Sequence, residues 1–182
     1  MRPNIIGGKY RGKKIDILNA EGLRPTSSRI RETLFNWLQQ DINQVATLDL
    51  FAGSGLLSFE SLSRGAKQST LIEKDIKIYQ TLKKNAAFLK GAPIIFHNTD
   101  ALSFIKINSL APYQLIFIDP PFASTLCHDV LKELTTKLSA NTLLYIESPT
   151  LIDALPFHSR RIKHKKVGQV FFSLFQTQGR QT

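Results

Sequence analysis

The residues with the most distinctive chemistry are Asp119-Pro120-Pro121-Phe122, which follow the apolar run Leu115–Ile118. A carboxylate and a backbone carbonyl can both accept hydrogen bonds from one amino group, which makes its nitrogen more nucleophilic by positioning and electrostatics. Asp119 would supply the carboxylate, Pro120 the carbonyl, and both prolines would fix the loop. Phe122 would offer a flat face to a base that has left its helix. The motif therefore predicts delivery of a methyl group to the exocyclic amine of a nucleobase, although the four residues alone fit a rigid turn equally well.

A glycine-rich turn after an earlier apolar run forms the second candidate site. Leu48-Asp49-Leu50-Phe51 is typical of a buried strand, and Ala52-Gly53-Ser54-Gly55 lets the backbone come close to a ligand. Glu73 ends the next strand, where a carboxylate is placed to bind two ribose hydroxyls. Because the strands of a parallel sheet end at one edge, we expect a cofactor pocket beside the Asp-Pro-Pro-Phe motif.

The same turn also comes close to a dinucleotide-binding fingerprint. Residues 53–58 nearly match G-x-G-x-x-G, and Glu73 stands twenty residues beyond Gly53. A site for NAD is therefore a rival interpretation. However, the third glycine position holds Ser58, and a dehydrogenase has no use for Asp-Pro-Pro-Phe. S-adenosylmethionine is the better fit.

An alternation of strands and helices is expected to position both sites. The predicted strands are 45–50, 69–73, 93–97, 113–118 and 141–147, and the predicted helices are 55–64, 75–89, 101–107 and 124–138. Such alternation indicates a parallel sheet with helices on both faces. A hairpin over 5–18 and a helix capped by Ser27 or Ser28 would precede it. A hairpin of 160–167 and 169–176 would close it.

The composition is typical of an intracellular protein. The 182 residues suffice for one domain and a small appendage. The single cysteine, Cys127, excludes an internal disulfide and a cysteine metal cluster, and the four histidines are scattered. No apolar stretch reaches membrane-spanning length, and no signal-peptide core follows Met1. We expect a soluble, cytoplasmic monomer without a metal or a membrane partner.

The net charge of +10 is concentrated at the two ends of the chain. Residues 1–32 hold eight Lys and Arg against three acids, residues 158–182 hold six against none, and residues 33–157 hold ten against eleven. One basic run alone is as often solvated surface, but two runs around a nearly neutral body indicate contact with a phosphate backbone. The candidate contacts are Lys9, Arg11, Arg24, Arg29, Arg160, Arg161 and Lys163.

Five motifs together carry a family resemblance. They are Ile5-Ile6-Gly7-Gly8 with Arg11-Gly12, Leu23-Arg24-Pro25-Thr26-Ser27-Ser28-Arg29-Ile30-Arg31-Glu32-Thr33-Leu34-Phe35-Asn36, Leu48–Gly55, Leu62-Ser63-Arg64-Gly65-Ala66 and Phe117–Phe122. From Ile5 to the 168–170 turn, the chain resembles the bacterial 16S ribosomal RNA guanine-N2 methyltransferases of the RsmD type. The Arg-Pro-Thr block with Arg-x-Arg-Glu is its most specific part. The family commonly has Asp where Ser28 stands, which argues against a carboxylate role at this position.

The resemblance implies a class I methyltransferase fold, which is α/β and Rossmann-like, with a seven-stranded, mostly parallel sheet and helices on both faces. Residues 1–42 would form a small hairpin-plus-helix extension, and 43–182 the methyltransferase domain. It implies methyl transfer from S-adenosylmethionine to the N2 amine of one guanine in 16S rRNA, within the small ribosomal subunit or its assembly intermediate. An amino methyltransferase of DNA adenine-N6 or cytosine-N4 and a non-catalytic RNA-binding assembly factor are the alternatives.

The resemblance also assigns residues to the cofactor. Phe51, Gly53 and Gly55 would line its methionine part, Glu73 its ribose and Asp100 its adenine amine, although Asp100 could equally cap a helix. The full cofactor set is Asp49, Phe51, Gly53, Ser54, Gly55, Glu73, Asp100, Thr26 and Arg31. Within it, Asp49 is expected to support the turn, and Thr26 and Arg31 would lie with Arg29 near the cofactor and substrate entrance. Asp119 to Phe122 would hold the guanine.

Overall fold

The central strands are short and fully buried because helices cover both faces of the sheet. The structure, a computed structural model, describes residues 2–18, 26–122 and 125–179. Every residue of β1 (Ala46–Asp49) and β4 (Leu115–Ile118) is buried, as expected for strands in the middle of a parallel sheet. The other strands are β2 (Gln68–Ile72), β3 (Ile94–His97), β5 (Leu143–Ser148), β6 (Ser159–Val167) and β7 (Val170–Thr177).

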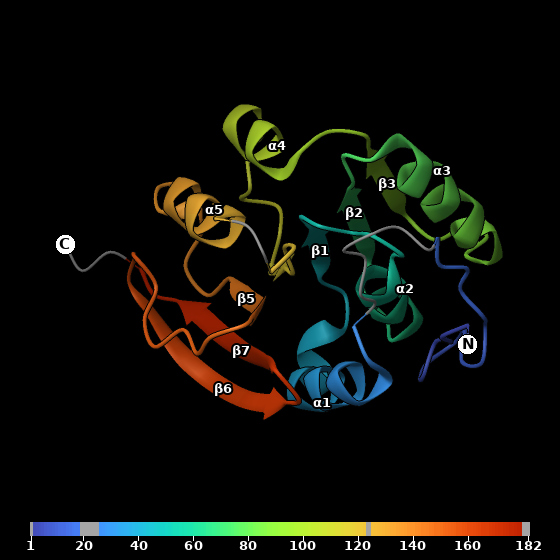
Figure 1. Cartoon of the computed structure of the whole chain (residues 1–182), viewed down its shortest axis with the longest axis horizontal. Helices are drawn as coiled ribbons and strands as arrows, with labels where there is room; N and C mark the ends of the chain where they lie inside the picture. Colours follow the sequence, from blue (N-terminus) through green and yellow to red (C-terminus); the bar gives the residue numbers. More distant parts are fainter. Residues whose placement is uncertain (1, 19–25, 123–124, 180–182) are drawn as a thin grey trace.

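The seven strands form one sheet in the order β3-β2-β1-β4-β5-β7-β6 (Figure 1). β1 to β5 pair in parallel, whereas β7 runs antiparallel to both β5 and β6. The C-terminal hairpin thus closes the sheet as predicted, and the predicted fold class is confirmed.

Alternate residues of each strand serve two hydrophobic clusters. Leu115 and Phe117 pack with α1 (Ser28–Leu38), α2 (Leu56–Ser63) and α3 (Ile76–Asn85). Ile116 and Ile118 pack with α4 (Ala101–Ile107) and α5 (Leu126–Leu134) on the other face. Among the described residues, no helix combines the length and apolar character needed to span a bilayer.

The helices α1, α3 and α4 begin after residues whose side chains accept from their first backbone N–H groups. The Ser27 hydroxyl accepts from Ile30 N at the start of α1, and Asp75 caps α3 in the same way. α2 begins after Gly55, which has φ +82°, and a Cβ here would lie 2.6 Å from the Phe59 ring and 2.5 Å from Leu82 Cδ1. Gly55 is therefore required by the backbone and by the packing beneath the turn.

The N-terminal residues form a closed loop rather than a pair of strands. Ile5 N donates to Lys13 O and Gly12 N to Ile5 O, and one antiparallel bridge joins Asn4 to Lys14. Ile5 and Ile15 are fully buried in the cluster that also contains α1 and the sheet. The division into residues 1–42 and 43–182 stays a prediction.

Candidate active site

The predicted site residues gather at the carboxyl ends of neighbouring strands. Asp49 ends β1, Glu73 follows β2, and Asp119 follows β4, and these three strands lie side by side in the sheet. Parallel strands of an open α/β sheet bind ligands at this edge, where the strand order changes direction. The sequence therefore predicted correctly that the glycine turn and the Asp-Pro-Pro-Phe motif share one edge.

Glu73 fastens the glycine turn to the second strand. Its Oε2 accepts a hydrogen bond from Gly53 N at 3.0 Å and its Oε1 accepts one from Asp75 N at 2.8 Å. The side chain is 9% exposed, and burial raises the pKa of Glu73 above its ordinary value. Each carboxylate oxygen has a second lone pair, so the group can also accept from ribose hydroxyls. These acceptor oxygens fit the ribose hydroxyls of the predicted cofactor.

Asp49 supports the turn from behind. It is 1% exposed, accepts from the Ser58 hydroxyl at 3.0 Å, and lies 3.4 Å from Phe51 N. Burial, opposed by these two hydrogen bonds, raises its pKa to about 7. Ser58 occupies the third position of the dinucleotide-like motif, so a buried hydrogen bond replaces the close glycine contact that the fingerprint requires. The supporting role predicted for Asp49 agrees with these contacts.

Asp119 is held by a residue from the N-terminal part of the chain. The Thr26 hydroxyl donates to Asp119 Oδ2 at 3.2 Å, and Thr26 itself is 9% exposed. Thr26 was expected at the cofactor, and its observed contact is with the predicted amine-binding carboxylate. Pro120 is buried, whereas Phe122 is 37% exposed, so its ring remains available for stacking.

A second carboxyl group adjoins Asp119 and was missed by sequence reasoning. Burial is the main cause of the raised pKa of Asp119, and the neighbouring Glu147 of β5 raises it further. The Tyr145 hydroxyl donates to Glu147 Oε1 at 2.7 Å. A signal was available, because Glu147 is an acid near the end of a predicted strand, as Glu73 and Asp119 are.

Arg31 is a fully buried part of a polar network beneath the N-terminal loop. Its Nε lies 3.3 Å from Thr26 O, its Nη1 donates to Asn4 O at 3.0 Å, and Nη1 pairs with Glu60 Oε2 at 3.4 Å. Nη2 has no partner among the described residues. The remaining donors to Glu60 are Ile6 N, Gly7 N and Arg64 Nε. Sequence reasoning missed Glu60, although an acid in the otherwise uncharged Leu56–Leu62 segment signals a buried partner.

The other predicted cofactor residues have different environments. Phe51 and Ser54 are half-buried in the turn. Asp100 caps α4 by accepting from Ser103 N at 2.9 Å, and this interaction with Ser103 lowers its pKa. The structure therefore confirms that Asp100 caps a helix. A contact between Asp100 and an adenine amine stays a prediction.

Most of the predicted RNA contacts are exposed, and they lie on three separate parts of the chain. Lys9 and Arg11 lie on the N-terminal loop, Arg29 on α1, and Arg160 and Lys163 on β6. Arg161 is half-buried, with Nη1 donating to Ile152 O at 2.9 Å and pairing with Asp153 at 3.1 Å. Arg24 lies outside the described residues.

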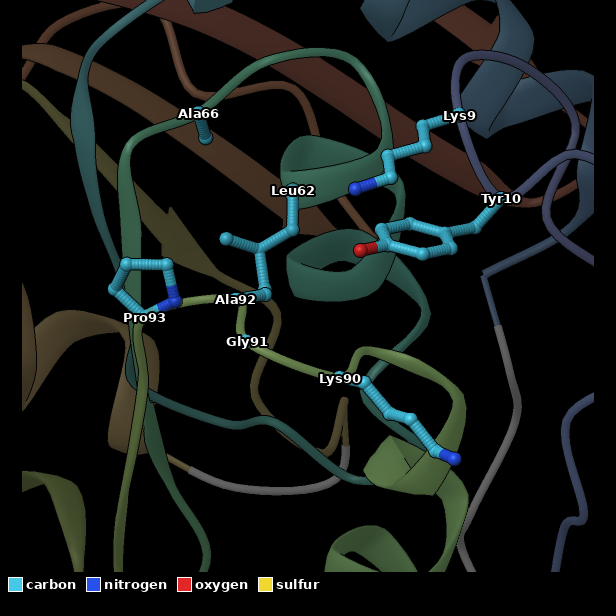
Figure 2. Close-up of a pocket in the computed structure, with 8 residues that line it drawn as sticks. All are labelled: Lys9, Tyr10, Leu62, Ala66, Lys90, Gly91, Ala92 and Pro93. Atoms are coloured by element: carbon cyan, nitrogen blue, oxygen red, sulfur yellow. The ribbon is translucent and has the colours of Figure 1, made fainter.

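A cleft of about 230 Å³ lies between the N-terminal loop and the segment before β3. Its lining residues are Lys9, Tyr10, Leu62, Ala66, Lys90, Gly91, Ala92 and Pro93 (Figure 2). The Lys9 ammonium and the Tyr10 hydroxyl point toward Leu62, and the Lys90 side chain extends away from the other lining residues. Pro93 precedes β3 and Ala66 precedes β2, so the cleft adjoins the amino ends of these strands, opposite the edge with Glu73 and Asp119. The part of the chain that the structure describes holds no group of His, Cys, Asp or Glu suited to a metal ion.

The strand order and the position of the site define a class I methyltransferase, with a glycine turn after β1, a carboxylate after β2 and Asp-Pro-Pro-Phe after β4. The chain belongs to the family described as conserved hypothetical protein 95, whose model matches residues 3–176. The family resemblance carried by the five motifs is thereby confirmed.

Named relatives cover nearly the whole chain. It is 40% identical over 176 residues to ribosomal RNA small subunit methyltransferase D of Escherichia coli K12, which covers 94% of this chain and 88% of that protein. The protein of the same name from Haemophilus influenzae is 41% identical over 180 residues, which cover 94% of this chain and 92% of that protein. The solved structure of yhhF from Escherichia coli, described as a methyltransferase, has a TM-score of 0.87 at 39% identity and covers 99% of this chain and 100% of that one. The structure of an RNA methyltransferase of Salinibacter ruber in complex with S-adenosyl-L-homocysteine shares the fold at 14% identity. Its TM-score is 0.68, and the match covers 87% of this chain and 97% of that one.

Proposed function

We propose that this protein transfers a methyl group from S-adenosylmethionine to the N2 amine of a guanine in 16S rRNA. The observation that carries the proposal is the position of Asp119, which Thr26 holds after β4 beside the glycine turn and Glu73. The rRNA small subunit methyltransferases that align with almost all of this chain support the choice of substrate.

The protein acts mainly by positioning the guanine amine. Asp119 accepts a hydrogen bond from one N2 hydrogen and the Pro120 carbonyl accepts one from the other, which favours a pyramidal, nucleophilic nitrogen. Phe122 stacks on the flipped base through its exposed ring. S-adenosylmethionine supplies an electrophilic methyl group on a sulfonium. This geometry needs neither a metal nor a covalent enzyme intermediate.

The cofactor is held by the turn between β1 and α2 and by the carboxylate after β2. Gly53 and Gly55 both have positive φ, which keeps the turn close to the sheet. Glu73 holds this turn and accepts the ribose hydroxyls with its remaining lone pairs. Asp49 and Ser58 fix the turn from below.

The basic ends of the chain contact the RNA backbone. Lys9 and Arg11 are exposed on the loop that Glu60 and Ser63 hold against α2. The cleft beside Lys9 adds the Tyr10 hydroxyl, a donor suited to a phosphate, whereas the Lys90 side chain extends away from the other lining residues. Arg160 and Lys163 are exposed on the edge strand β6. Charged side chains on an edge strand also prevent pairing with the sheets of other molecules. A test must therefore separate binding of phosphate from protection of the sheet edge.

Transfer of labelled methyl groups to three substrates in parallel tests the proposal. Assembled small subunits, free 16S rRNA and double-stranded DNA should be incubated with the protein and labelled S-adenosylmethionine. Label is expected in 16S rRNA, in free or assembled form, and not in DNA. Label in DNA would favour the DNA amino methyltransferase. No binding of S-adenosylmethionine by calorimetry would favour the non-catalytic assembly factor.

A further inference from the structure

Glu147 lies beside Asp119 at the site edge of the sheet, and no sequence motif assigns it a role. β4 and β5 pair in parallel with Phe117 opposite Tyr145, and both rings pack in the cluster that contains α1. Two residues further along, Asp119 and Glu147 therefore face the same side, with their backbones about 4.8 Å apart across the sheet. A base that binds Asp119 through its amine would bring the neighbouring atoms of its edge toward Glu147.

The Glu147 carboxyl group is held in place and can still accept further hydrogen bonds. The Tyr145 hydroxyl donates to its Oε1 at 2.7 Å, and a carboxylate offers about four acceptor sites. Glu147 forms no ion pair with a Lys or Arg among the residues that the structure describes. It is 3% exposed, so only a group that enters the site as deeply as Asp119 can reach it. Burial raises its pKa to about 7, opposed by Tyr145 and Thr26, and another donor would further favour the carboxylate.

The atom beside the reacting amine distinguishes guanine from the other bases that carry such an amine. In guanine, the ring nitrogen N1 next to the N2 amine carries a hydrogen and is a donor. In adenine and cytosine, the ring nitrogen next to the amine carries a lone pair instead. A carboxylate accepts a hydrogen bond from the first and is repelled by the second. Enzymes that act on flipped bases read them through this Watson–Crick edge.

We propose that Glu147 selects guanine by accepting a hydrogen bond from N1–H while Asp119 and Pro120 hold the N2 amine. This role rests on the function proposed above, and it adds the group that excludes adenine and cytosine. Tyr145 is then a positioning residue, because its hydroxyl fixes the Glu147 carboxylate. Glu147 takes part in no bond that forms or breaks during methyl transfer.

RNA with 2-aminopurine in place of the methylated guanine tests this role, because that base keeps the amine and lacks the hydrogen on N1. The wild type should methylate guanine with a kcat/KM at least about 10²-fold higher, since a buried carboxylate would face the lone pair of 2-aminopurine. In Glu147→Gln, the amide can turn an N–H toward this lone pair. Its kcat/KM for 2-aminopurine should therefore exceed the wild-type value by about tenfold, the effect of one hydrogen bond, a gain that a merely structural role would not produce.

The matched control is Glu133→Gln, which changes a half-buried acid one residue before the end of α5 and should keep both wild-type values. Thermal unfolding and S-adenosylhomocysteine binding check the fold of Glu147→Gln. Equal methylation of the two bases by the wild type would overturn the role of Glu147 without any variant. Unchanged 2-aminopurine activity in folded Glu147→Gln would overturn it as well. A wild-type product other than N2-methylguanosine would instead refute the proposed function.

Discussion

In the proposed mechanism, Asp119 makes the amine of a nucleobase reactive because it is a half-buried carboxylate oriented by a hydrogen bond from Thr26. Replacing it with Asn keeps the shape of the side chain and removes the charge. We expect kcat to fall by about 10²-fold or more, the usual effect of removing one preorganised electrostatic group, with little change in cofactor affinity. Single-turnover methylation and calorimetry measure the two quantities. Asp41→Asn, at an exposed acid far along the chain, is the matched control, and near-normal turnover in Asp119→Asn would refute the assigned mechanism.

Glu73 accepts hydrogen bonds from Gly53 N and Asp75 N of the turn, and the proposed function assigns it the ribose hydroxyls as well. Glu73→Gln keeps one carbonyl oxygen that can still accept from the backbone of the turn, and it removes one of the acceptors for ribose. S-adenosylhomocysteine binding should weaken by about 1–3 kcal/mol, the range for an unsatisfied buried polar group. Calorimetry measures this, with thermal unfolding as the check on the turn. Binding of NADH in place of S-adenosylhomocysteine would instead support the dinucleotide interpretation.

At the residue scale, the sequence predicted the groups that belong to contiguous motifs. Asp119, Glu73 and the glycine turn were predicted because each stands at the end of an apolar run, and parallel strands bring such ends together. Glu147 and the contact of Thr26 with Asp119 were not predicted. Their relation to Asp119 depends on strand register and on where the start of α1 lies over the sheet, and neither is encoded in local spacing.

Among the elements, α2 fastens the N-terminal loop and α1 to the body through Glu60. Glu60→Ala leaves Arg31 buried without its carboxylate, and such losses destabilise proteins by about 3–5 kcal/mol. The control is Asp16→Ala, which breaks the exposed Arg2–Asp16 pair and should cost about 0–1 kcal/mol. Urea unfolding measures both changes. Equal stability of the two variants would show that the buried network adds nothing to the docking of the loop.

The observed element boundaries differ from the predicted ones where tertiary contacts override the local sequence pattern. The hairpin predicted over 5–18 became a loop with one antiparallel bridge, because Ile6 N and Tyr10 N donate to Glu60 and Ser63 of α2 and only part of the backbone pairs across the loop. The helix predicted over 75–89 ends at Asn85, whose side chain binds the backbone of Asp16, and continues as a short 3₁₀ turn. The strands were predicted closely, since the apolar runs that define them are bounded by turn residues.

Strand β6 allows a test with neighbouring arginines in different settings. Arg160 is exposed, whereas Arg161 is already engaged with Ile152 O and Asp153. If β6 contacts phosphates, Arg160→Ala should reduce the slope of log K against log salt by about 0.7–0.9, and Arg161→Ala by less. Salt-dependent RNA binding measures the slopes. Equal slopes in both variants and the wild type would assign the basic edge to protection against strand pairing.

For the whole molecule, the charge sits at both ends of the chain while the catalytic body is nearly neutral. Lys9→Ala and Arg11→Ala, both exposed in the basic N-terminal run, should each weaken RNA binding and lower the salt slope without changing kcat at saturating RNA, because phosphate contacts position the substrate and do not select the base. Lys106→Ala and Lys132→Ala, exposed on α4 and α5, are the controls. A loss of kcat in the first pair, or equal slopes in all four, would contradict this use of the charge.

The most direct test of the central claim is the identity of the methylated nucleoside. Wild-type protein and Asp119→Asn should be incubated with small subunits and labelled S-adenosylmethionine, and the 16S rRNA should be digested to nucleosides for chromatography and mass spectrometry. The label from the wild type should appear as N2-methylguanosine, and Asp119→Asn should form very little of it. A methyl group found on a ring nitrogen, on a ribose hydroxyl or on another base would refute the proposed mechanism, because the Asp119 and Pro120 acceptors are suited to an exocyclic amine.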